Sequence, residues 1–495
     1  MYFLGLDVGS SSVKAALVDS KSGKSIQSVH EPKSEMSISS LKNDWAEQDP
    51  NVWWKYTCSA IKRVCKESNI NPKKIISIGI SYQMHGLVIV DKDGKTIRDS
   101  IIWCDSRAVN IGNDAFKKLG EDKCMSHLLN SPGNFTASKL KWVKENEPEV
   151  YDKIHKYMLP GDFIAYKLTG EINTTINGLS EGIIWDYKKN ETANWLLDFY
   201  GINPNLTPNL VDNFTIQGVT NSKSSEETGL DIGIPITYRA GDQPNNALAL
   251  NVFDNGEVAA SGGTSGVIYS ITNNINSKEP SRINHFAHVN YDSSYNTSIG
   301  KLLCINGAGI QYRWLRNHSV GKSYEKMNEA ASSITVGSNG ISVIPFGNGA
   351  ERMLDNKNIG THICNINLNQ HSHGHLYRSS LEGIAFSFMY GMEILKNDNA
   401  LINVVRAGND NLFRSKIFAN TVATLIGHEI EIYNTTGAFG AARASGILND
   451  NLDSFRKKIT KNDHVMTFLP LKNKSEYEDA YSRWKEDLHD ILKNK

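Results

Sequence analysis

Hydrophobic residues fall along the chain in a pattern that predicts strands followed by helices, in two successive halves. Residues 3–18 predict a strand, a tight turn of small residues and a second strand, and residues 257–270 repeat that pattern. Short β-branched runs at 75–81 and 87–90 are typical of buried strands. We therefore expect an α/β chain in which each half contains a β-hairpin of this kind.

Helical periodicity marks segments between and beyond these strands. We expect helices over 138–157, 191–200, 375–395 and 415–427, and further buried strands at 341–346 and 403–408. Near the C-terminal end, apolar residues recur at helical spacing, namely Tyr477, Tyr481, Trp484, Leu488 and Ile491. This spacing predicts a last helix that packs on the second half.

The two hairpins align with one another. Pairing Gly9 with Gly263 also pairs Ser10 with Thr264, at an offset of 254 residues, which is about half of the 495-residue chain. Self-similarity at a fixed offset indicates repeated structural units. We therefore expect a duplicated domain with a cleft between the two copies.

The repeat also predicts a division of the chain. We expect one domain over residues 1–246 and the other over residues 247–495, with no low-complexity linker between them. The copies differ at one position, because Asp7 of the first hairpin aligns with Ser261 of the second. Only the first turn therefore carries a carboxylate.

Composition narrows the class of protein. Lys+Arg and Asp+Glu are both 53, and this balance argues against a nucleic-acid or anionic-membrane surface spread over the molecule. No apolar stretch is long enough to span a membrane, and the N-terminus lacks the basic region of a signal peptide. The six cysteines form no CxxC pair, so we expect free thiols in a cytoplasmic protein. The oligomeric state stays open, with a homodimer as one option.

Turns of small residues between two strands can bind phosphate. Such a turn presents backbone N–H groups to an anion without side-chain obstruction. Two turns in register, one of them following Asp7, indicate a polyphosphate between the domains with a divalent cation beside Asp7. The alternative is a pair of ordinary tight hairpins. The candidate phosphate-binding residues are Gly9, Ser10, Ser11, Ser12, Gly263, Thr264, Ser265 and Gly266.

Asp242 is the candidate catalytic base. It follows a predicted strand and begins a predicted helix in PITYRAGDQPNNALAL. Reactive groups in α/β proteins lie at the carboxyl ends of strands, and an aspartate there can accept a proton from a substrate hydroxyl during phosphoryl transfer. The alternative role is an N-cap that satisfies helix N–H groups.

Two strand ends carry residues that suit a polyol. Residues 83–86 include Met84 and His85 and close the strand at 75–81, and they could place polar groups over a sugar. Trp103 and Arg107 at another strand end offer an aromatic face and charged donors for hydroxyl groups. Both segments could equally be plain strand ends.

Four further motifs are candidate ligand sites. The glycine-containing segments 406–410 and 437–442 could contact the base and ribose of a nucleotide, or could serve helix packing. Residues 321–323 resemble the end of a phosphate-binding P-loop, but the glycine that this loop needs five positions earlier is absent. The alternating histidines at 371–375 lack a nearby carboxylate or cysteine, which favours a helix-entry loop over a metal site.

Together these motifs resemble the FGGY carbohydrate kinases, and among them most closely the xylulokinases. The segments occur in the order found in that family, from residue 4 to beyond residue 440. They are LDVGSSSVKAAL, WAEQDPNVWW, SYQMHG, WCDSR, FTASKLKWVKENEPEVY, LPGDFIAYKLTGE, AGDQPNNALAL, SGGTSGV and HLYRSSLEG.

The resemblance implies a fold, two ligands and residue roles. The fold is α/β, with two ribonuclease-H-like domains of the actin-like ATPase type that close a catalytic cleft on ATP and a small-molecule sugar. Asp7 corresponds to the carboxylate near Mg²⁺ and Asp242 to the catalytic base. Met84 and His85 correspond to sugar contacts, and the turn with Gly408 and Asn409 corresponds to the adenine site.

Several positions depart from the family pattern. Xylulokinases usually have Asn after the catalytic Asp, where this chain has Gln243, and the longer side chain beside the base is expected to affect which hydroxyl groups are recognised. The adenine turn at 407–410, the stretch 350–354 and the segment 174–180 also differ from the usual motifs. Because Asp7, Asp242 and both turns remain, we expect an active, divergent enzyme.

The sequence therefore predicts ATP-dependent phosphorylation of D-xylulose. The nearest alternative is the same reaction on another ketose or polyol, such as ribulose, fuculose or glycerol. An alternative from another class is an actin-like ATPase without a sugar acceptor, which leaves the segments at 83–86 and 103–107 unexplained.

Overall fold

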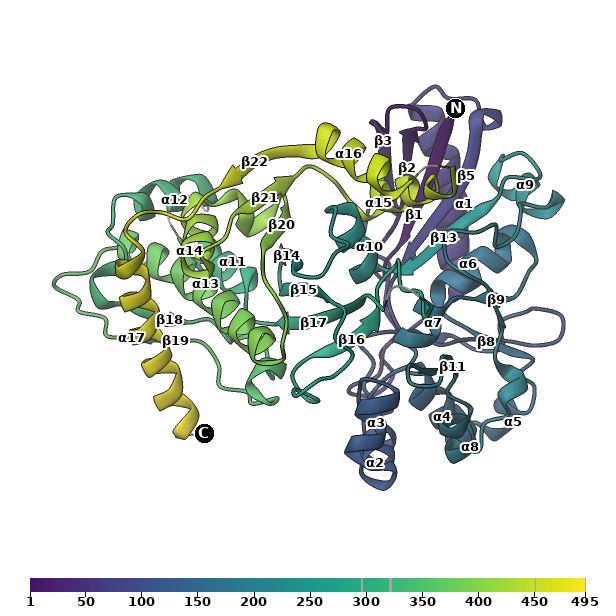
Figure 1. Cartoon of the computed structure of the whole chain (residues 1–495), viewed down its shortest axis with the longest axis horizontal. Helices are drawn as coiled ribbons and strands as arrows, with labels where there is room; N and C mark the ends of the chain where they lie inside the picture. Colours follow the sequence, from purple (N-terminus) through teal and green to yellow (C-terminus); the bar gives the residue numbers. More distant parts are fainter. Residues whose placement is uncertain (295–296, 320–322, 450, 495) are drawn as a thin grey trace.

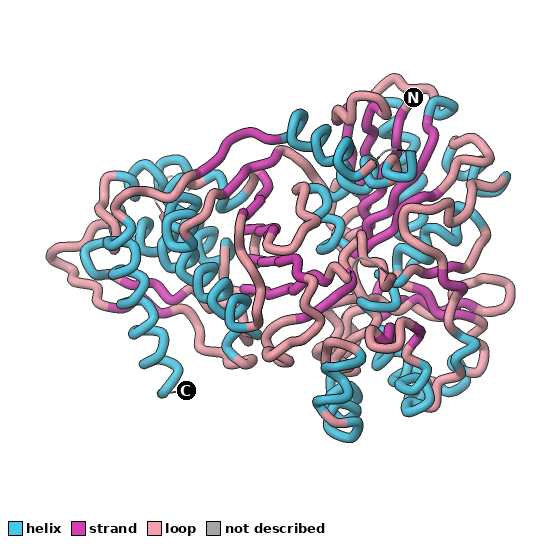
Figure 2. Tube along the Cα trace, viewed as in Figure 1, coloured by secondary structure: helices cyan, strands magenta, loops and turns pink. Residues whose placement is uncertain are grey.

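The structure is a computed structural model, and it describes residues 1–294, 297–319, 323–449 and 451–494. Two lobes, each built on its own β-sheet, lie side by side (Figure 1). Strands form the centre of each lobe and helices lie outside them (Figure 2). No helix among the described residues is long and apolar enough to cross a membrane. The P-loop-like segment at 321–323 lies partly outside the described residues.

The first sheet defines the N-terminal lobe. Its strand order is β13-β5-β1-β2-β3, with β1, β2 and β3 antiparallel and β5 and β13 parallel to β1. Its strands are β1 (Tyr2–Val8), β2 (Val13–Asp19), β3 (Ser25–Glu31), β5 (Ile75–Tyr82) and β13 (Ile236–Gly241). The predicted first hairpin is confirmed, because β1 and β2 pair over their whole length.

The second sheet defines the C-terminal lobe and repeats this order. An antiparallel meander of β14, β15 and β17 is followed by the parallel strands β20 and β21. Its strands are β14 (Glu257–Gly262), β15 (Gly266–Thr272), β16 (Asn284–Ala287), β17 (Ile299–Ile305), β20 (Val404–Gly408), β21 (Ile430–Tyr433) and β22 (His464–Phe468). The shared topology confirms two ribonuclease-H-like units, with β16 and β22 added at the edges of the second.

Helices cover the sheets and connect their strands. In the first half they are α1 (Pro50–Glu67), α2 (Val109–Leu119), α3 (Glu121–His127), α4 (Thr136–Asn146), α5 (Pro148–Tyr151), α6 (Pro160–Thr169), α7 (Ile176–Glu181), α8 (Asn194–Tyr200), α9 (Ser222–Thr228) and α10 (Asp242–Ala249). In the second half they are α11 (Gly309–His318), α12 (Tyr324–Ser332), α13 (His373–Asn397), α14 (Lys416–Ile426), α15 (Gly437–Ala444), α16 (Leu452–Asp463) and α17 (Lys474–Lys493).

Short strands and 3₁₀ turns complete the chain. The strands are β4 (Glu47–Gln48), β6 (Val88–Val90), β7 (Ser100–Ile101), β8 (Lys156–Met158), β9 (Asn173–Thr174), β10 (Trp185–Asp186), β11 (Glu191–Thr192), β12 (Asn209–Leu210), β18 (Ser342–Ile344) and β19 (His362–Cys364). The 3₁₀ turns are η1 (Pro72–Lys74), η2 (Pro204–Leu206), η3 (Ser338–Gly340), η4 (Arg352–Leu354), η5 (Asn411–Arg414) and η6 (Ile447–Asn449).

The predicted helix over 138–157 is wrong in its extent. The first helix there ends at Asn146, and Pro148 begins a separate short helix. Proline cannot donate the backbone hydrogen bond that a continuous helix needs, and the chain then enters β8. The predicted helix over 191–200 likewise begins only at Asn194, after the short strand β11.

The last helix packs on the C-terminal lobe as predicted. Trp484 on α17 is 1% exposed, and its indole N–H donates to the Val343 carbonyl at 2.9 Å. Tyr477, Tyr481 and Leu488 are also buried on the same face. The helical spacing of these residues therefore identified a face that contributes to the core.

Helix α15 belongs in sequence to the second half but packs on the first sheet (Figure 1). A Cβ atom on Gly5 of β1 would lie 1.9 Å from the Ala438 carbonyl oxygen, and one on Gly79 of β5 would lie 2.0 Å from that of Ala441. Only glycine allows the helix backbone to approach these strands so closely. The segment 437–442 thus serves helix packing, the second of its two predicted roles.

Helices α10 and α15 meet where the lobes join. The Asn245 side-chain amide donates to the Gly437 carbonyl at 2.9 Å, and a Cβ atom on Gly440 would lie 2.5 Å from Ala249 Cβ. The predicted boundary after residue 246 falls within α10 and stays a prediction.

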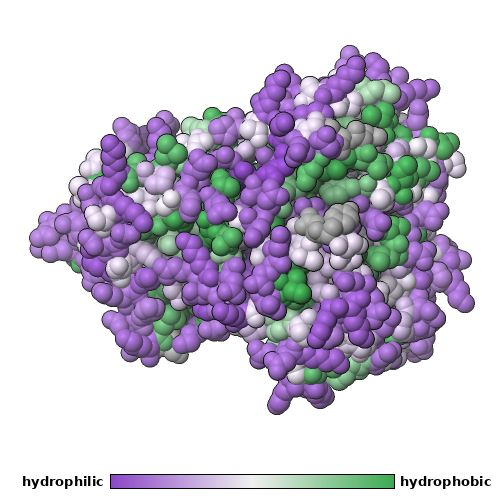
Figure 3. Space-filling view, viewed as in Figure 1, coloured by the Kyte–Doolittle hydropathy of each residue, from purple (hydrophilic) through white to green (hydrophobic). Residues whose placement is uncertain are grey.

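Figure 3 shows that the viewed face is largely hydrophilic, with the larger hydrophobic patches on the N-terminal lobe.

Candidate functional site

Three parallel strands of the N-terminal lobe bring the predicted catalytic segments together. Ser81 of β5 pairs in register with Asp7 of β1 on one side and with Ala240 of β13 on the other. The Ser81 hydroxyl donates to Asp7 Oδ1 at 3.1 Å. Because the carboxyl ends of parallel strands share one edge of a sheet, Asp242, which follows β13, lies on the same edge as Asp7.

Asp242 is partly buried and lies close enough to Asp7 for the charge of Asp7 to affect its pKa. Burial and, to a smaller extent, the charge of Asp7 together raise the pKa of the Asp242 carboxyl to about 7, against hydrogen bonds from Gln243 that oppose the shift. A carboxyl that titrates near neutral pH can accept a proton and release it again under ordinary conditions. The group has the electrostatics of a general base.

Lys14 lies beside both carboxylates. It is directly opposite Asp7 in the β1–β2 hairpin, and its Nζ forms an ion pair with Asp7 Oδ2 at 3.2 Å. The charge of Asp7 and, more weakly, that of Asp242 raise the pKa of the Lys14 ammonium. The sequence analysis missed Lys14, although the register of the predicted hairpin places it opposite Asp7.

The N-cap alternative for Asp242 is wrong. The N-cap of α10 is Gly241, and Asp242 is the first helical residue. No side-chain hydrogen bond caps this helix. The Asp242 carboxylate instead interacts with the next residue, Gln243, through both its side chain and its backbone.

Met84 and His85 lie next to this edge. A Cβ atom on Gly241 would lie 2.6 Å from Met84 Cγ, so Met84 packs against the residue that precedes Asp242. The His85 ring contacts Phe135 edge-on at 5.0 Å between centroids, and its Nδ1 is buried without a hydrogen-bond partner among the described residues. His85 has a φ of 41°, which few non-glycine residues adopt.

Lys139 holds the His85 segment from behind. Its Nζ donates to the His85 carbonyl at 3.1 Å and to the Ile102 carbonyl at 2.9 Å. Burial lowers the pKa of the Lys139 ammonium to about 7, and burial also lowers the pKa of His85 well below its usual value. Lys139 thus ties the predicted sugar segment to the strand end before Trp103, a role that the sequence analysis did not assign.

Glu181 at the end of α7 is a second group that the sequence analysis missed. Its side chain is fully buried, and a Cβ atom on Gly241 would lie 2.6 Å from its Oε2. Neither carboxylate oxygen has a hydrogen-bond partner among the described residues. Burial raises the pKa of Glu181 well above its usual range, which disfavours the ionised form of this carboxyl.

The first small-residue turn lies beside Trp103. The Gly9 amide donates to the Ser12 carbonyl at 3.0 Å, which closes the turn between β1 and β2. The Trp103 indole N–H donates to Ser10 Oγ at 3.3 Å, and the side chain of Trp103 is half exposed. The structure therefore brings a predicted sugar contact next to a predicted phosphate contact.

Arg107 is not placed to contact a sugar. Its side chain is 1% exposed and forms ion pairs with Asp105 and Glu47, both at 2.6 Å. The guanidinium also stacks on Trp45 at 3.8 Å. These contacts pair the charge of the buried guanidinium with two carboxylates, so the structure gives Arg107 a structural role in place of the predicted sugar contact.

The second small-residue turn joins β14 and β15. Its Gly263 carbonyl accepts from the Gly309 amide at 3.1 Å, and its Thr264 carbonyl accepts from the Ile310 amide at 3.0 Å. A Cβ atom on Gly309 would lie 2.2 Å from the Gly263 carbonyl oxygen, so the start of α11 needs glycine to approach the turn. The turn is thereby fixed against α11.

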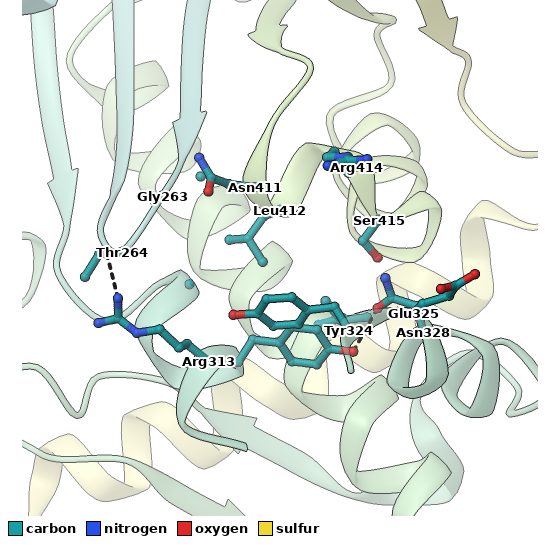
Figure 4. A pocket seen from close by; sticks show the side chains of 14 residues that line it. Gly263, Thr264, Arg313, Tyr324, Glu325, Asn328, Asn411, Leu412, Arg414 and Ser415 are labelled. Carbon is teal, nitrogen blue, oxygen red and sulfur yellow. Dashed lines mark hydrogen bonds between the residues drawn. The ribbon is translucent and has the colours of Figure 1, made fainter. Parts of the chain in front are cut away.

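A cavity of about 730 Å³ opens from this second turn (Figure 4). Tyr312 and Tyr324 stack at 5.6 Å between ring centroids on one side of it. Arg313 reaches across the cavity mouth toward Thr264, with 3.5 Å between Nη1 and Oγ1. An aromatic wall, two arginines and a small-residue turn suit a flat base linked to phosphate groups. Leu412, Arg414 and Ser415 line the opposite side.

Gly408 and Asn409 do not line this cavity. Gly408 ends β20, and the Asn409 amide donates to the Tyr433 carbonyl at 2.8 Å, which continues the sheet. The lining begins two residues later, at Asn411. Residues of η5 and Ser415 line the cavity where Gly408 and Asn409 do not, and an adenine contact at Gly408 and Asn409 stays a prediction.

Comparison with protein families matches both lobes. The N-terminal domain of the FGGY family of carbohydrate kinases matches residues 2–249. The C-terminal domain of the same family matches residues 258–448. Together the two matches cover most of the chain and both small-residue turns.

Individual relatives agree with this result. The chain is 27% identical to a xylulose kinase of Staphylococcus xylosus over 432 residues, which covers 86% of this chain and 87% of the relative. It is 28% identical to a xylulose kinase of Bacillus subtilis over 410 residues, or 82% and 79% of the two chains. The solved structure of a xylulose kinase from Rhodospirillum rubrum has a TM-score of 0.88 at 21% identity and covers 99% of this chain and 100% of its own, which shows the same fold.

Proposed function

Because the chain belongs to the FGGY family of carbohydrate kinases and is a sugar phosphotransferase, we propose that it transfers the terminal phosphoryl group of ATP to the 5-hydroxyl of D-xylulose. The observation that carries this proposal is the position of Asp242, which follows β13, lies close to Asp7 and adjoins Met84. Relatives that are named xylulose kinases support the choice of sugar.

Asp242 acts as the general base. Its carboxylate takes the proton of the attacking hydroxyl while the bond between oxygen and phosphorus forms and the bond to ADP breaks. Phosphoryl transfer needs little covalent chemistry from the protein, so positioning and charge stabilisation supply most of the rate. Met84 and His85 are proposed to hold the sugar against this base, with Trp103 and Gln243 as further contacts.

The two turns are proposed to hold the phosphate groups. Backbone N–H groups of residues 9–12 and 263–266 would donate to phosphate oxygens from opposite lobes. The cavity beside residue 263 would take the base of ATP, between the tyrosine wall and residues 411–415. Closure of the lobes would then exclude water from the reacting groups.

Mg²⁺ is proposed to bind beside Asp7. Asp7, close enough to Asp242 for the two charges to interact, fits a cation that uses one or two protein carboxylates together with substrate phosphates. Bound there, the cation would neutralise charge on the phosphoryl oxygens. In this arrangement Asp7 would hold the cation, and Asp242 would take the proton from the sugar hydroxyl.

The test is Asp242→Asn, which keeps the shape of the side chain and removes the base. We expect kcat for D-xylulose to fall by roughly 10²–10⁴-fold, while ATP binding, measured separately by calorimetry, changes little. A variant that turns over D-xylulose within a few-fold of wild type would show that Asp242 is not the base.

A second acceptor within the same reaction is favoured by Gln243. The Gln243 side chain is longer than the Asn that xylulokinases usually have there, and it interacts with Asp242. This difference would allow the hydroxyl of another ketose or polyol to align with the base. An ADP-release assay over D-xylulose, ribulose, fuculose and glycerol separates these acceptors. Membership of a carbohydrate kinase family disfavours an ATPase without a sugar acceptor. A cytoplasmic location and a homodimeric state stay predictions.

A further inference from the structure

The first small-residue turn, residues 9–12, is held in place by the side chain of Gln48. The side-chain nitrogen of Gln48 donates to the Ser10 carbonyl at 2.7 Å and to the Ser37 carbonyl at 3.2 Å. The side-chain oxygen of Gln48 accepts from the Trp53 indole N–H at 3.0 Å. Gln48 is 4% exposed and Trp53 is fully buried. These hydrogen bonds therefore fix the orientation of the Gln48 amide.

The backbone around Gln48 is also fixed. Gln48 belongs to β4, where it pairs in register with Ser100 of β7. The next residue, Asp49, caps α1, and the first turn of α1 carries Trp53 to the Gln48 side chain. The Gln48 amide is therefore directed at the Ser10 carbonyl by the fold itself, without a bound ligand.

The hydrogen bond to the Ser10 carbonyl sets the direction of the next backbone amide. In a planar trans peptide the C=O of one residue and the N–H of the next point in opposite directions. Because the Ser10 carbonyl points toward Gln48, the Ser11 N–H points away from Gln48. The Met36 amide donates to the Ser11 carbonyl at 2.8 Å, which directs the Ser12 N–H away from Met36 in the same way.

These two amides are available to a ligand. In the part of the chain that the structure describes, neither the Ser11 nor the Ser12 N–H donates a hydrogen bond, whereas the Gly9 N–H closes the turn. Ser11 is exposed. Successive backbone N–H groups that point outward from a turn form a binding site for an anion. The Gln48 hydrogen bond therefore orients one of the two donors that the turn offers to a phosphate group.

The second turn shows the same arrangement at the aligned position. Ser10 aligns with Thr264, and the Thr264 carbonyl accepts from the Ile310 amide at 3.0 Å. This hydrogen bond directs the Ser265 N–H away from α11. The aligned carbonyl is therefore held in both turns, by a helix backbone in the second lobe and by the Gln48 side chain in the first.

We propose that Gln48 is a positioning residue for phosphoryl transfer, because its hydrogen bond to the Ser10 carbonyl aims the Ser11 N–H at a phosphate oxygen of the nucleotide. This inference rests on the proposed function, in which the turn at residues 9–12 binds phosphate groups. Gln48 acts through the turn and exchanges neither a proton nor a bond with a substrate. A donor that is oriented in advance stabilises phosphate charge without reorganisation of the turn during the reaction.

The test compares the affinity of the full-length protein for the β,γ-imido analogue of ATP, with Mg²⁺, and for adenosine. Adenosine lacks the phosphate groups, so the ratio of the two affinities measures phosphate binding. Gln48→Met keeps the length of the side chain and removes its amide. Calorimetry should show the analogue binding about 3–10-fold more weakly to this variant, the range expected for one oriented hydrogen bond, with adenosine unchanged. An unchanged ratio would overturn the inference.

Two further variants separate orientation of the turn from packing. Gln48→Glu keeps the shape of the side chain and the acceptor for Trp53, but its carboxylate cannot donate to Ser10. It should therefore lose at least as much affinity for the analogue as Gln48→Met, and wild-type affinity in Gln48→Glu would contradict the proposal. Gln27→Met is the matched control and should bind like wild type, because Gln27 lies in β3 and its side chain donates to Glu67 at 3.1 Å.

Steady-state kinetics distinguish this role from a loss of stability. With D-xylulose as acceptor, Gln48→Met should raise KM for ATP and lower kcat while KM for D-xylulose changes little. A lower kcat with both KM values unchanged would indicate only a smaller folded fraction and would reject the inference.

The outcome for Gln48 is separable from that of the proposed function. Turnover of D-xylulose by wild type, together with an unchanged affinity ratio in Gln48→Met, would leave the proposed function intact and reject this inference. A Gln48-dependent ratio in a protein that does not turn over D-xylulose would support the inference and reject the choice of xylulose.

Discussion

Asp242, Asp7 and Lys14 form a coupled charge group at the edge of the first sheet. Asp7 raises the pKa of the Asp242 carboxyl, whereas Lys14 lowers it. The Lys14 side chain is 45% exposed, so solvent screens part of its effect. The protonation state of the base therefore depends on a cation that contacts the neighbouring carboxylate.

We expect the rate to rise with pH through about 7. A base is active only when ionised, and the Asp242 carboxyl has a pKa of about 7, so kcat/KM should be low below that pH and level off above it. A pH–rate profile with D-xylulose measures this rise in rate. A flat profile between pH 5 and 8 would contradict the assignment of Asp242 as the base.

Lys14→Met should move the rise in kcat/KM to higher pH. Without the cation the ionised form of Asp242 loses stabilisation, and we expect a shift of roughly half a pH unit, limited by solvent screening. The pH–rate profile is again the measurement. Lys21→Met is the control, because Lys21 is exposed in the turn after β2, and its profile should match wild type.

At the level of elements, α15 decides how closely the two halves of the chain associate. Gly5 and Gly79 of the first sheet lie against the backbone of this helix. A Cβ atom on Gly437, at its start, would lie 3.0 Å from Asp7 Oδ2. The helix therefore both covers the sheet and limits the space behind the Asp7 carboxylate.

Gly79→Ala should destabilise the protein by about 1–3 kcal/mol, because the added methyl group overlaps the Ala441 carbonyl and forces the helix away from the sheet. Thermal or urea unfolding measures the change. In Gly408→Ala the nearest atoms are at 3.4 Å, an ordinary contact, so this control should unfold like wild type. Equal stability of Gly79→Ala and wild type would show that α15 can shift at no cost.

The whole molecule is two similar lobes, and the second half of the chain supplies one helix, α15, to the first lobe. The first sheet needs α15, which begins 196 residues after the last strand of that sheet ends, to cover its Gly5 and Gly79 face. Arg443 of α15 adds hydrogen bonds to the Gly23 carbonyl and to Ser25 Oγ, both at 2.9 Å. The N-terminal lobe is therefore incomplete without the C-terminal half of the sequence.

A fragment of residues 1–256 should fail to fold cooperatively, because the face of its sheet that α15 covers would be exposed to water. We expect weak near-UV circular dichroism and no sharp thermal transition. Coexpression with residues 257–495 should restore both signals. A fragment that alone melts as sharply as the full chain would show that the first sheet does not depend on α15.

The sequence by itself determined the features that depend on local pattern. The hairpins, the paired turns, the position of Asp242 after a strand and the buried face of α17 all follow from residue spacing within a few turns or one hairpin. The register of the first hairpin even places Lys14 opposite Asp7. These features were predictable because alternation and helical periodicity reflect which side of an element is buried.

Only the tertiary structure decided which neighbours each functional residue meets. Arg107 is bound by Asp105, Glu47 and Trp45, and the lining of the cavity beside the second turn includes Asn411 but not Gly408. The Ser10 carbonyl is held by Gln48, which lies 38 residues away in the sequence. Such contacts arise from long-range packing, which local periodicity does not encode, so the contacts of a charged side chain emerge only when distant segments meet.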